Sequence, residues 1–296
     1  MRGWVLDCYP DMDANRMVLW FKTPQGPVRI VDDLVPHIYV HATRGRLAKL
    51  TTDLTMISVK DAALQRRRIS LGEKEKDVLA VPVREYASLQ PLAMTIDSWG
   101  CYREHALYDV DLRMDQRYFL SKGLFAMGLT DVEKLRSVDA WRRIDYPVPD
   151  LKGLVLGVDV SSSGIPTMND PLTSISANDI VLDGAEDEML GDLMTLVRDE
   201  DPDIIYTDRG DSFVLPYLQH RASLHGMKME LGRENGERTS RGKSYFTYGR
   251  IVYKPPAHKL RGRVHIDRQA SFTYAEAGLP GLIEMSRLSH IPFRTS

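Results

Sequence analysis

Short apolar segments with the character of β-strands open the chain. They occupy residues 18–21, 28–31, 38–40 and 78–84. The first two flank Pro24–Pro27, a Pro- and Gly-containing segment typical of a turn. Helical spacing of apolar residues appears in the first part of 43–68 and again in 86–99. The first 100 residues are therefore predicted to mix strands and helices.

A second series of elements follows Asp145–Asp150, a proline-rich connector that cannot continue a helix. Trp141 and Ile144 are the buried anchors expected in the region before it. The elements predicted after the connector are strands at 151–160 and 204–206, helices at 185–199 and 213–225, a hairpin of 244–253 with 263–267, and a last helix at 273–290 interrupted near Pro280. Strands that alternate with helices indicate an α/β sheet domain.

Composition excludes several classes of protein. The 296 residues are 43% hydrophobic and 27% charged, as in soluble globular proteins. The chain has no apolar run of 18 residues or more, so no membrane span is expected, and its first residues do not resemble a signal peptide. Cys8 and Cys101 lack metal-site spacing and are expected to be reduced thiols, which favours a cytoplasmic location. The scattered histidines do not predict a zinc site.

Charge is distributed unevenly, although the net charge is only −2. Residues 179–211 contain twelve acidic residues and two Arg, whereas residues 228–268 contain eleven Lys or Arg and four acidic residues. This asymmetry is compatible with a nucleic-acid face on one side of the protein. It is equally compatible with two solvated faces of opposite sign.

Residues 108–128 carry a specific resemblance. Their order is similar to the pattern Y-x-x-D-I-x-F-x-x-R-Y-L-I-x-x-G-L, with which B-family (archaeal-type) DNA polymerases leave the N-terminal domain and enter the 3′→5′ exonuclease domain. The matching positions are Tyr108, Asp111, Leu112, Arg117, Tyr118, Phe119, Leu120, Gly123 and Leu124. The resemblance covers about residues 4–290 and is greatest to the inactivated paralogues of this family found in archaea.

The resemblance implies an α/β (α+β) fold with two domains. Residues 1–130 would form the N-terminal mixed β-sheet domain, 131–150 a connector, and 151–296 a ribonuclease-H-like exonuclease-fold domain. The sequence ends before the family's third exonuclease motif and before its polymerase palm. A truncated gene or a fragment of a longer polymerase is therefore expected, and this chain alone is not expected to polymerise DNA.

The family's exonuclease motifs supply carboxylates, because the Mg²⁺ ions of such a site need oxygen ligands. In the first motif, Asp-Ile-Glu, Asp159 is retained and Ser161 replaces the glutamate. In the second, Asp201-Pro202-Asp203 and Gly210-Asp211 fix the frame. Arg209 then stands at the motif asparagine and Val214 at the catalytic aspartate.

These replacements predict no catalytic residues, no bound metal or other cofactor, and no exonuclease activity. The alternative is a cryptic metal-dependent 3′→5′ nuclease that holds Mg²⁺ at a rebuilt site, with Asp170 or Asp208 as substitute ligands. Pro36-His37 and Met114 also depart from the Pro-Tyr and Phe around the family's template-uracil pocket, so uracil sensing is not implied.

A basic and aromatic stretch near the C-terminus is the predicted DNA contact. Aromatic side chains interleaved with cations are typical of surfaces that bind single strands. The residues concerned are Lys243, Tyr248, Arg250, Tyr253, Lys254, Arg261 and Arg263, together with Arg66–Arg68 as a second candidate. The alternative is a solvated sheet edge whose aromatic side chains face the core. The expected function is a DNA-binding or scaffolding module in replication or repair, with single-stranded or primer-template DNA, and polymerase or replication proteins, as partners.

Overall fold

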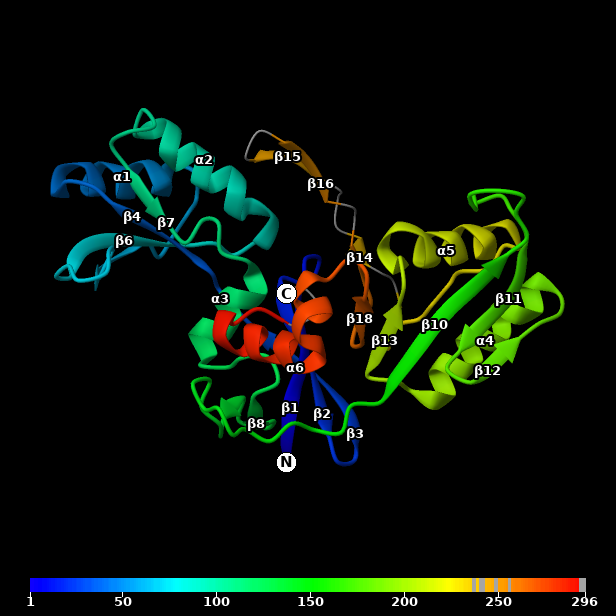
Figure 1. The fold of residues 1–296 in the computed structure, drawn as a ribbon. Helices are drawn as coiled ribbons and strands as arrows, with labels where there is room; N and C mark the ends of the chain where they lie inside the picture. The colour runs from blue at the N-terminus through cyan, green and yellow to red at the C-terminus, as the bar shows by residue number, and fades with distance from the viewer. Residues whose placement is uncertain (236–237, 240–242, 248–249, 255–256, 293–296) are drawn as a thin grey trace. The chain divides into compact units, whose positions relative to one another are not determined.

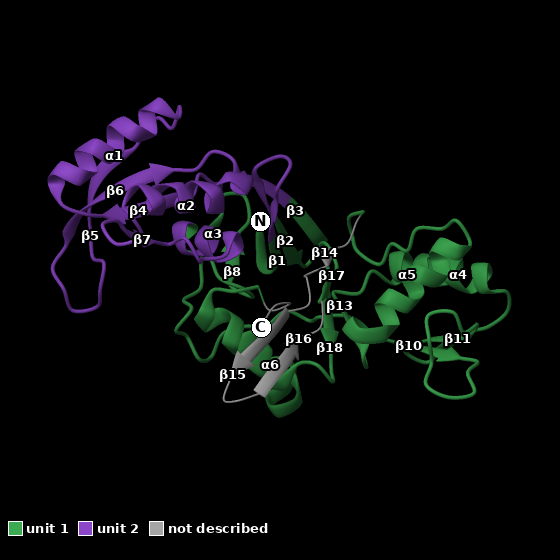
Figure 2. Ribbon diagram, turned by 90° about the horizontal axis from the view of Figure 1, so that it is seen from above, with its two compact units in different colours: residues 1–8, 19–29, 122–296 green, residues 9–18, 30–121 purple. Residues whose placement is uncertain are grey.

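The computed structural model describes all residues except 236–237, 240–242, 248–249, 255–256 and 293–296 (Figure 1). The chain forms two compact units (Figure 2). Unit 1 comprises residues 1–8, 19–29 and 122–296, and unit 2 comprises residues 9–18 and 30–121.

The first sheet has the strand order β3-β2-β1-β8-β9. Its strands are β1 (Arg2–Asp11), β2 (Arg16–Thr23), β3 (Gly26–Asp33), β8 (Leu129–Asp131) and β9 (Arg136–Ser137). β2 and β3 confirm the strands predicted at 18–21 and 28–31. The predicted turn falls between them, and Gly26 has a φ of 118°, which a residue with a side chain rarely adopts.

Unit 2 contains a second, four-stranded antiparallel sheet with the order β5-β6-β4-β7. Its elements are β4 (His37–His41), α1 (Arg44–Met56), β5 (Ala63–Arg67), β6 (Lys76–Pro82), α2 (Leu89–Trp99) and β7 (Ala106–Tyr108). The one-turn helix η1 (Tyr86–Ser88) precedes α2. Alternate residues of the central strands, such as Ile38 and Val40, pack in one apolar cluster with Leu47 of α1 and Ile96 of α2. Both helices therefore cover the same face of this sheet. α3 (Met114–Lys122) follows β7.

The third sheet lies in unit 1 and has the order β12-β11-β10-β13-β18. Its strands are β10 (Gly153–Val160), β11 (Leu172–Ala177), β12 (Ile180–Leu182), β13 (Ile204–Thr207) and β18 (Val264–Asp267). The central strand β10 pairs antiparallel with β11 and parallel with β13, which in turn pairs parallel with β18.

Helices cover both faces of this sheet. Ile205 of β13 packs in the cluster formed with α4 (Glu186–Glu200) and α5 (Leu215–Leu224). Its neighbours Ile204 and Tyr206 pack in the cluster formed with α6 (Phe272–Ser289). The strands and helices predicted at 151–160, 185–199, 204–206 and 213–225 are confirmed. The arrangement is a layered α/β domain.

The predicted hairpin of 244–253 with 263–267 is wrong. Residues 264–267 form β18 inside the third sheet, where they pair with β13. The hairpin consists instead of β15 (Lys243–Thr247) and β16 (Arg250–Lys254), flanked by β14 (Arg238–Thr239) and β17 (His258–Lys259), which pair with each other. A short apolar run fits an exposed hairpin and a buried parallel strand equally well.

α6 is interrupted as predicted. Gly278 leaves the helical region, with φ 60° and ψ −161°, two residues before Pro280. Proline removes a helical hydrogen bond, and glycine accepts the left-handed backbone that the break requires. Among the described helices, none combines the length and the apolar character needed to cross a membrane.

Residues 122–150, which include the predicted connector, belong to unit 1. The Trp4 indole nitrogen donates to the carbonyl of Pro147 at 2.9 Å. Arg287 of α6 pairs with Asp139 at 2.8 Å, and its Cζ lies 3.6 Å from the centre of the Tyr146 ring. Ile144 is wrongly predicted as an anchor, because its side chain is 90% exposed. Residues 139–147 are held through a buried charge and aromatic rings instead.

Candidate functional site

Asp159 lies near the end of β10, on an exposed position of the strand. Its Oδ2 accepts a hydrogen bond of 2.7 Å from the hydroxyl of Ser174, which stands opposite it on β11. Ser161 follows the strand, and its backbone N–H donates to the carbonyl of Pro171 at 3.0 Å. This end of β10 thus presents one carboxylate, already paired with a neighbouring hydroxyl.

Val214 lies at the junction of the π-helical turn η2 (Gly210–Val214) and α5. The residue is only 5% exposed and packs in the cluster between the third sheet and α4 and α5. Val158 and Val160 of β10 pack against the same cluster. Methyl groups therefore occupy this position, and the Val214 side chain supplies no oxygen to bind a cation.

Arg209 precedes this turn in a left-handed conformation, with φ 59°. Its backbone N–H donates to Asp267 Oδ1 at 3.1 Å, and its guanidinium carbon lies 5.8 Å from the centre of the Phe213 ring. The backbone N–H of Asp211 donates to the other oxygen of Asp267 at 3.0 Å. The Asp267 carboxylate therefore fixes the loop between β13 and η2.

A buried polar cluster beside this loop was not singled out as a site from the sequence. His265 contacts Thr207 Oγ1 through Nε2 at 2.8 Å, and its Nδ1 lies 3.5 Å from Asp211 Oδ1. Burial holds the pKa of His265 below its usual value, so the ring is neutral at pH 7. Asp211 also accepts from the backbone N–H of His258 at 2.7 Å. Gly210-Asp211 fixes the frame of the second motif in the sequence, but these contacts join strands far apart in the chain.

Asp170 and Asp208, the substitute ligands considered above, are engaged elsewhere. Asp208 forms a two-pronged pair with Arg268, at 3.0 and 2.7 Å. Asp170 accepts from the backbone N–H and the hydroxyl of Thr167, at 2.7 and 3.0 Å. In the described part of the chain, no group of three or more His, Cys, Asp or Glu side chains is placed to hold a metal ion.

The predicted DNA contact of Arg263 is wrong. Its side chain is 2% exposed, and its guanidinium donates to the carbonyls of Pro202 and Leu231, both at 2.5 Å, and to Asp201 at 2.8 Å. Arg263 therefore joins β18 to the end of α4. Arg261 is half-buried and donates to the carbonyl of Asn235 at 3.4 Å.

The other predicted DNA contacts lie on the hairpin. Its register pairs Lys243 with Lys254 and Thr247 with Arg250. The side chains of Lys243, Arg250, Tyr253 and Lys254, and all of Tyr248, lie outside the residues that the structure describes.

Comparisons with known proteins agree on one family. Residues 168–274 match the profile of "DNA polymerase family B, exonuclease domain". A DNA polymerase of Archaeoglobus fulgidus is 25% identical over 90% of this chain and 34% of its own length. A DNA polymerase of Pyrococcus glycovorans is 26% identical over 89% of this chain and 33% of its own length. The chain thus spans about a third of the length of these curated relatives.

The fold is similar to that of a solved polymerase. The family B DNA polymerase of Pyrobaculum calidifontis superposes with a TM-score of 0.71 at 19% identity, over 94% of this chain and 37% of that polymerase. The predicted mixed α+β architecture with a ribonuclease-H-like domain is thereby confirmed. The chain is similar to the family B DNA polymerases, and its residues 168–274 match their exonuclease domain.

Proposed function

We propose that this chain is a DNA-binding or scaffolding module of a polymerase-like protein in replication or repair, without 3′→5′ exonuclease activity of its own. The observation that carries the proposal is the position of Val214. The side chain at the expected ligand position lies inside an apolar cluster with Val158 and Val160. A two-metal nuclease needs carboxylates around two ions about 3.5–4 Å apart, and a valine supplies none.

The surrounding groups support the same reading. Asp159 is bonded to Ser174, and Asp208 to Arg268. Arg209 adds a positive charge to the loop before η2, where it opposes the binding of a cation. One carboxylate rarely holds Mg²⁺ without help from other ligands.

DNA binding is assigned to the β15–β16 hairpin. The sequence of its two strands contributes three cations, Lys243, Arg250 and Lys254. Three cations close together in the sequence suit a run of phosphates, and such contacts carry no sequence preference. The proposed ligand is single-stranded or primer-template DNA.

Nuclease activity is tested with a labelled primer incubated with Mg²⁺ or Mn²⁺. We expect no shortening of the primer by the wild type or by Asp159→Ala. Metal-dependent shortening by the wild type that disappears in Asp159→Ala would overturn the inactive assignment and favour the rebuilt nuclease. Shortening that is equal in both proteins would not come from this site.

Binding is tested by fluorescence anisotropy of a labelled single strand at several salt concentrations. If about four phosphates are neutralised, log affinity falls with log salt at a slope of roughly −3. Replacing Lys243, Arg250 and Lys254 together with Ala is expected to flatten the slope by about 2. A matched control replaces Lys60, Arg103 and Lys134, three exposed cations, with the same loss of charge. Equal effects of the two triple variants would contradict the assignment to the hairpin.

A further inference from the structure

The four-stranded sheet of unit 2 has one face that neither of its helices covers. Its elements follow the order β4-α1-β5-β6-α2-β7, which is the β-α-β-β-α-β arrangement with β4 and β6 in the centre. Ile38 and Val40 point to the helices. Their neighbours His37, Tyr39 and His41 therefore occupy the opposite face, because side chains alternate along a strand.

Two tyrosines lie side by side on that face, where Val78 and Ala80 of β6 are buried. The register places Tyr39 of β4 directly opposite Tyr108 of β7 and, on its other side, opposite Ala80 of β6. Both tyrosines are half-buried. The ring of His37 stacks on that of Tyr39, with their centres 6.1 Å apart and their planes 23° apart. This part of the sheet is an aromatic surface beside a small residue, Ala80.

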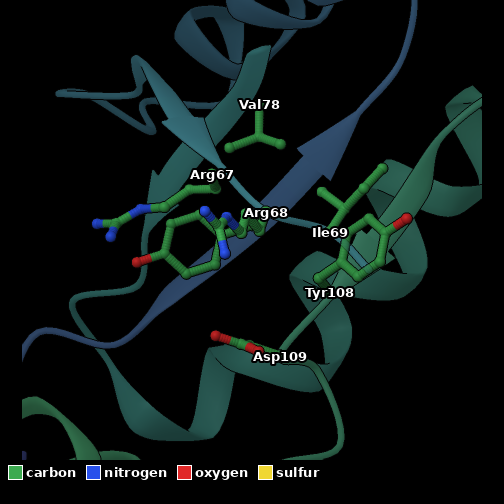
Figure 3. Close-up of a pocket in the computed structure, with 7 residues that line it drawn as sticks. Arg67, Arg68, Ile69, Val78, Tyr108 and Asp109 are labelled. Carbon is green, nitrogen blue, oxygen red and sulfur yellow. The ribbon is translucent and has the colours of Figure 1, made fainter. Parts of the chain in front are cut away.

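A cavity of about 320 Å³ opens over this surface (Figure 3). Its lining comprises Tyr39, Arg67, Arg68, Ile69, Val78, Tyr108 and Asp109. The Arg67 guanidinium carbon lies 5.5 Å from the centre of the Tyr39 ring. Arg68 is exposed and, within the part of the chain that the structure describes, has no ion-pair or hydrogen-bond partner.

We infer that this cavity binds one nucleotide of a single-stranded nucleic acid. Four-stranded sheets with uncovered aromatic side chains recognise single strands by stacking bases on them. Here Tyr39 and Tyr108 supply the stacking surface, and Arg67 and Arg68 supply two positive charges for the adjoining phosphate. A cavity of about 320 Å³ is within the range of small-ligand sites.

Asp109 fixes the orientation of the nucleotide. Its carboxylate repels phosphate, so the phosphate lies at the Arg67–Arg68 side and the edge of the base faces Asp109. A carboxylate accepts a hydrogen bond from the amino group of cytosine, whereas thymine presents an acceptor oxygen at the same ring position. The site therefore favours cytosine over thymine.

This inference extends the proposed DNA-binding role, on which it rests in part, to residues remote from the hairpin in the sequence. It also restricts the ligand, since a base inside a duplex cannot stack on a protein ring. The shared chemistry is an unpaired base with its phosphate, which either DNA or RNA provides. Binding measurements with single-stranded DNA, single-stranded RNA and duplex DNA distinguish these ligands.

The test measures binding of a labelled ten-nucleotide strand by anisotropy, with the full chain. Tyr39→Leu and Tyr108→Leu are expected to weaken binding between about 5-fold and 150-fold each, without changing the salt slope. Replacing Arg67 and Arg68 together with Ala should flatten that slope by about 1.4. Thermal unfolding of each variant shows whether it retains the fold.

Matched controls come from the same unit. Tyr102→Leu removes a tyrosine that is 72% exposed, and Lys60→Ala with Arg103→Ala removes two exposed cations. Affinity losses that are equal in the site and control variants would overturn the inference. Ultraviolet cross-linking adds a direct readout, because a bound strand should attach to Tyr39 or Tyr108. Cross-links found only elsewhere would also overturn it.

Different results would refute the hairpin proposal and the unit 2 sheet site. If the hairpin variant loses binding and the Tyr39 and Arg67–Arg68 variants do not, the sheet site alone is refuted. If the wild type binds none of the three nucleic acids, both proposals are refuted. Strands of dC should bind more tightly than strands of dT, and Asp109→Asn should remove most of that preference. Equal binding of dC and dT by the wild type would refute the role of Asp109.

Discussion

The end of β10 and the face of the unit 2 sheet opposite its helices differ in how their polar side chains are engaged. Around β10, Asp159 and Asp208 each have a partner within the protein, and Val214 is packed in an apolar cluster. On the unit 2 sheet, Tyr39 is half-buried beside a cavity and Arg68 is without a protein partner in the described structure. Polar groups that are satisfied inside the protein stabilise it, whereas exposed cations beside aromatic rings remain available to a ligand. The comparison predicts where substitutions will cost stability and where they will cost binding.

The largest expected loss of stability follows from Asp139→Ala. The side chains of Asp139 and Arg287 are 2% and 0% exposed, so the change leaves a guanidinium buried without its counter-ion. Removing one partner of such a pair costs roughly 3–5 kcal/mol. Urea unfolding measures the difference. Asp145→Ala is the control, since that side chain is 77% exposed and its loss should cost far less stability.

Val214→Asp is expected to destabilise the protein by roughly 2–4 kcal/mol, because a carboxyl group would be buried among apolar side chains. Val214→Ala removes methyl groups without adding a polar atom. The difference in unfolding free energy between Val214→Asp and Val214→Ala therefore measures the cost of burying a polar group at this position. Calorimetric titration of both variants with Mn²⁺ accompanies urea unfolding. An Asp variant as stable as wild type that also binds Mn²⁺ would show that the position is still an open ligand site.

A smaller effect depends on pH. Hydrogen bonds from Arg221 lower the pKa of Glu186 to about 2, from an ordinary value of 4.5. The Glu186 carboxyl binds a proton more weakly in the native state than in the unfolded chain. The Arg221–Glu186 pair therefore stabilises the fold fully above pH 4.5 and progressively less as pH falls towards 2. Between pH 7 and pH 3, Glu186→Gln should lose about 1–2 kcal/mol less stability than wild type. Identical pH profiles of urea unfolding for the two proteins would contradict this assignment.

The smallest effect is expected for Asp159→Ala. The carboxylate is exposed and accepts a hydrogen bond from the hydroxyl of Ser174. We expect a change in unfolding free energy within about 0.5 kcal/mol, since exposed side chains away from networks contribute little. Ser174→Ala should behave alike, because it removes the same hydrogen bond. A loss of more than 2 kcal/mol in either variant would place Asp159 among the structural groups of this molecule.

The sequence was sufficient for the features that local pattern determines. Apolar runs located β2, β10 and β13, and helical spacing located α4 and α5. Gly278 and Pro280 marked the break in α6. The motif frame also placed Val214 at a ligand position, and its burial agrees with the absence of a carboxylate there.

Features that depend on distant pairing could not be predicted in this way. Arg263 looked like a surface cation of the basic stretch, yet it is buried against Pro202 and Leu231, far from it in sequence. Residues 264–267 are apolar enough for either a hairpin or a central strand, and only pairing with β13 decides. Tyr39 and Tyr108 are 69 positions apart, and the register of β4 with β7 alone makes them neighbours.

The interleaving of the two units along the chain sets an order of folding during synthesis. Unit 2 has all of its residues once position 121 has left the ribosome, and Asn15 Oδ1 can then accept its hydrogen bond from the backbone of Tyr86. Unit 1 must wait for 122–296, because Arg2 and Trp4 of β1 pair with Asp131 and Leu129. Contacts this distant in sequence form late, since a long loop must close first. Arg2 and Trp4 therefore remain unpaired with β8 while unit 2 is being completed on the nascent chain.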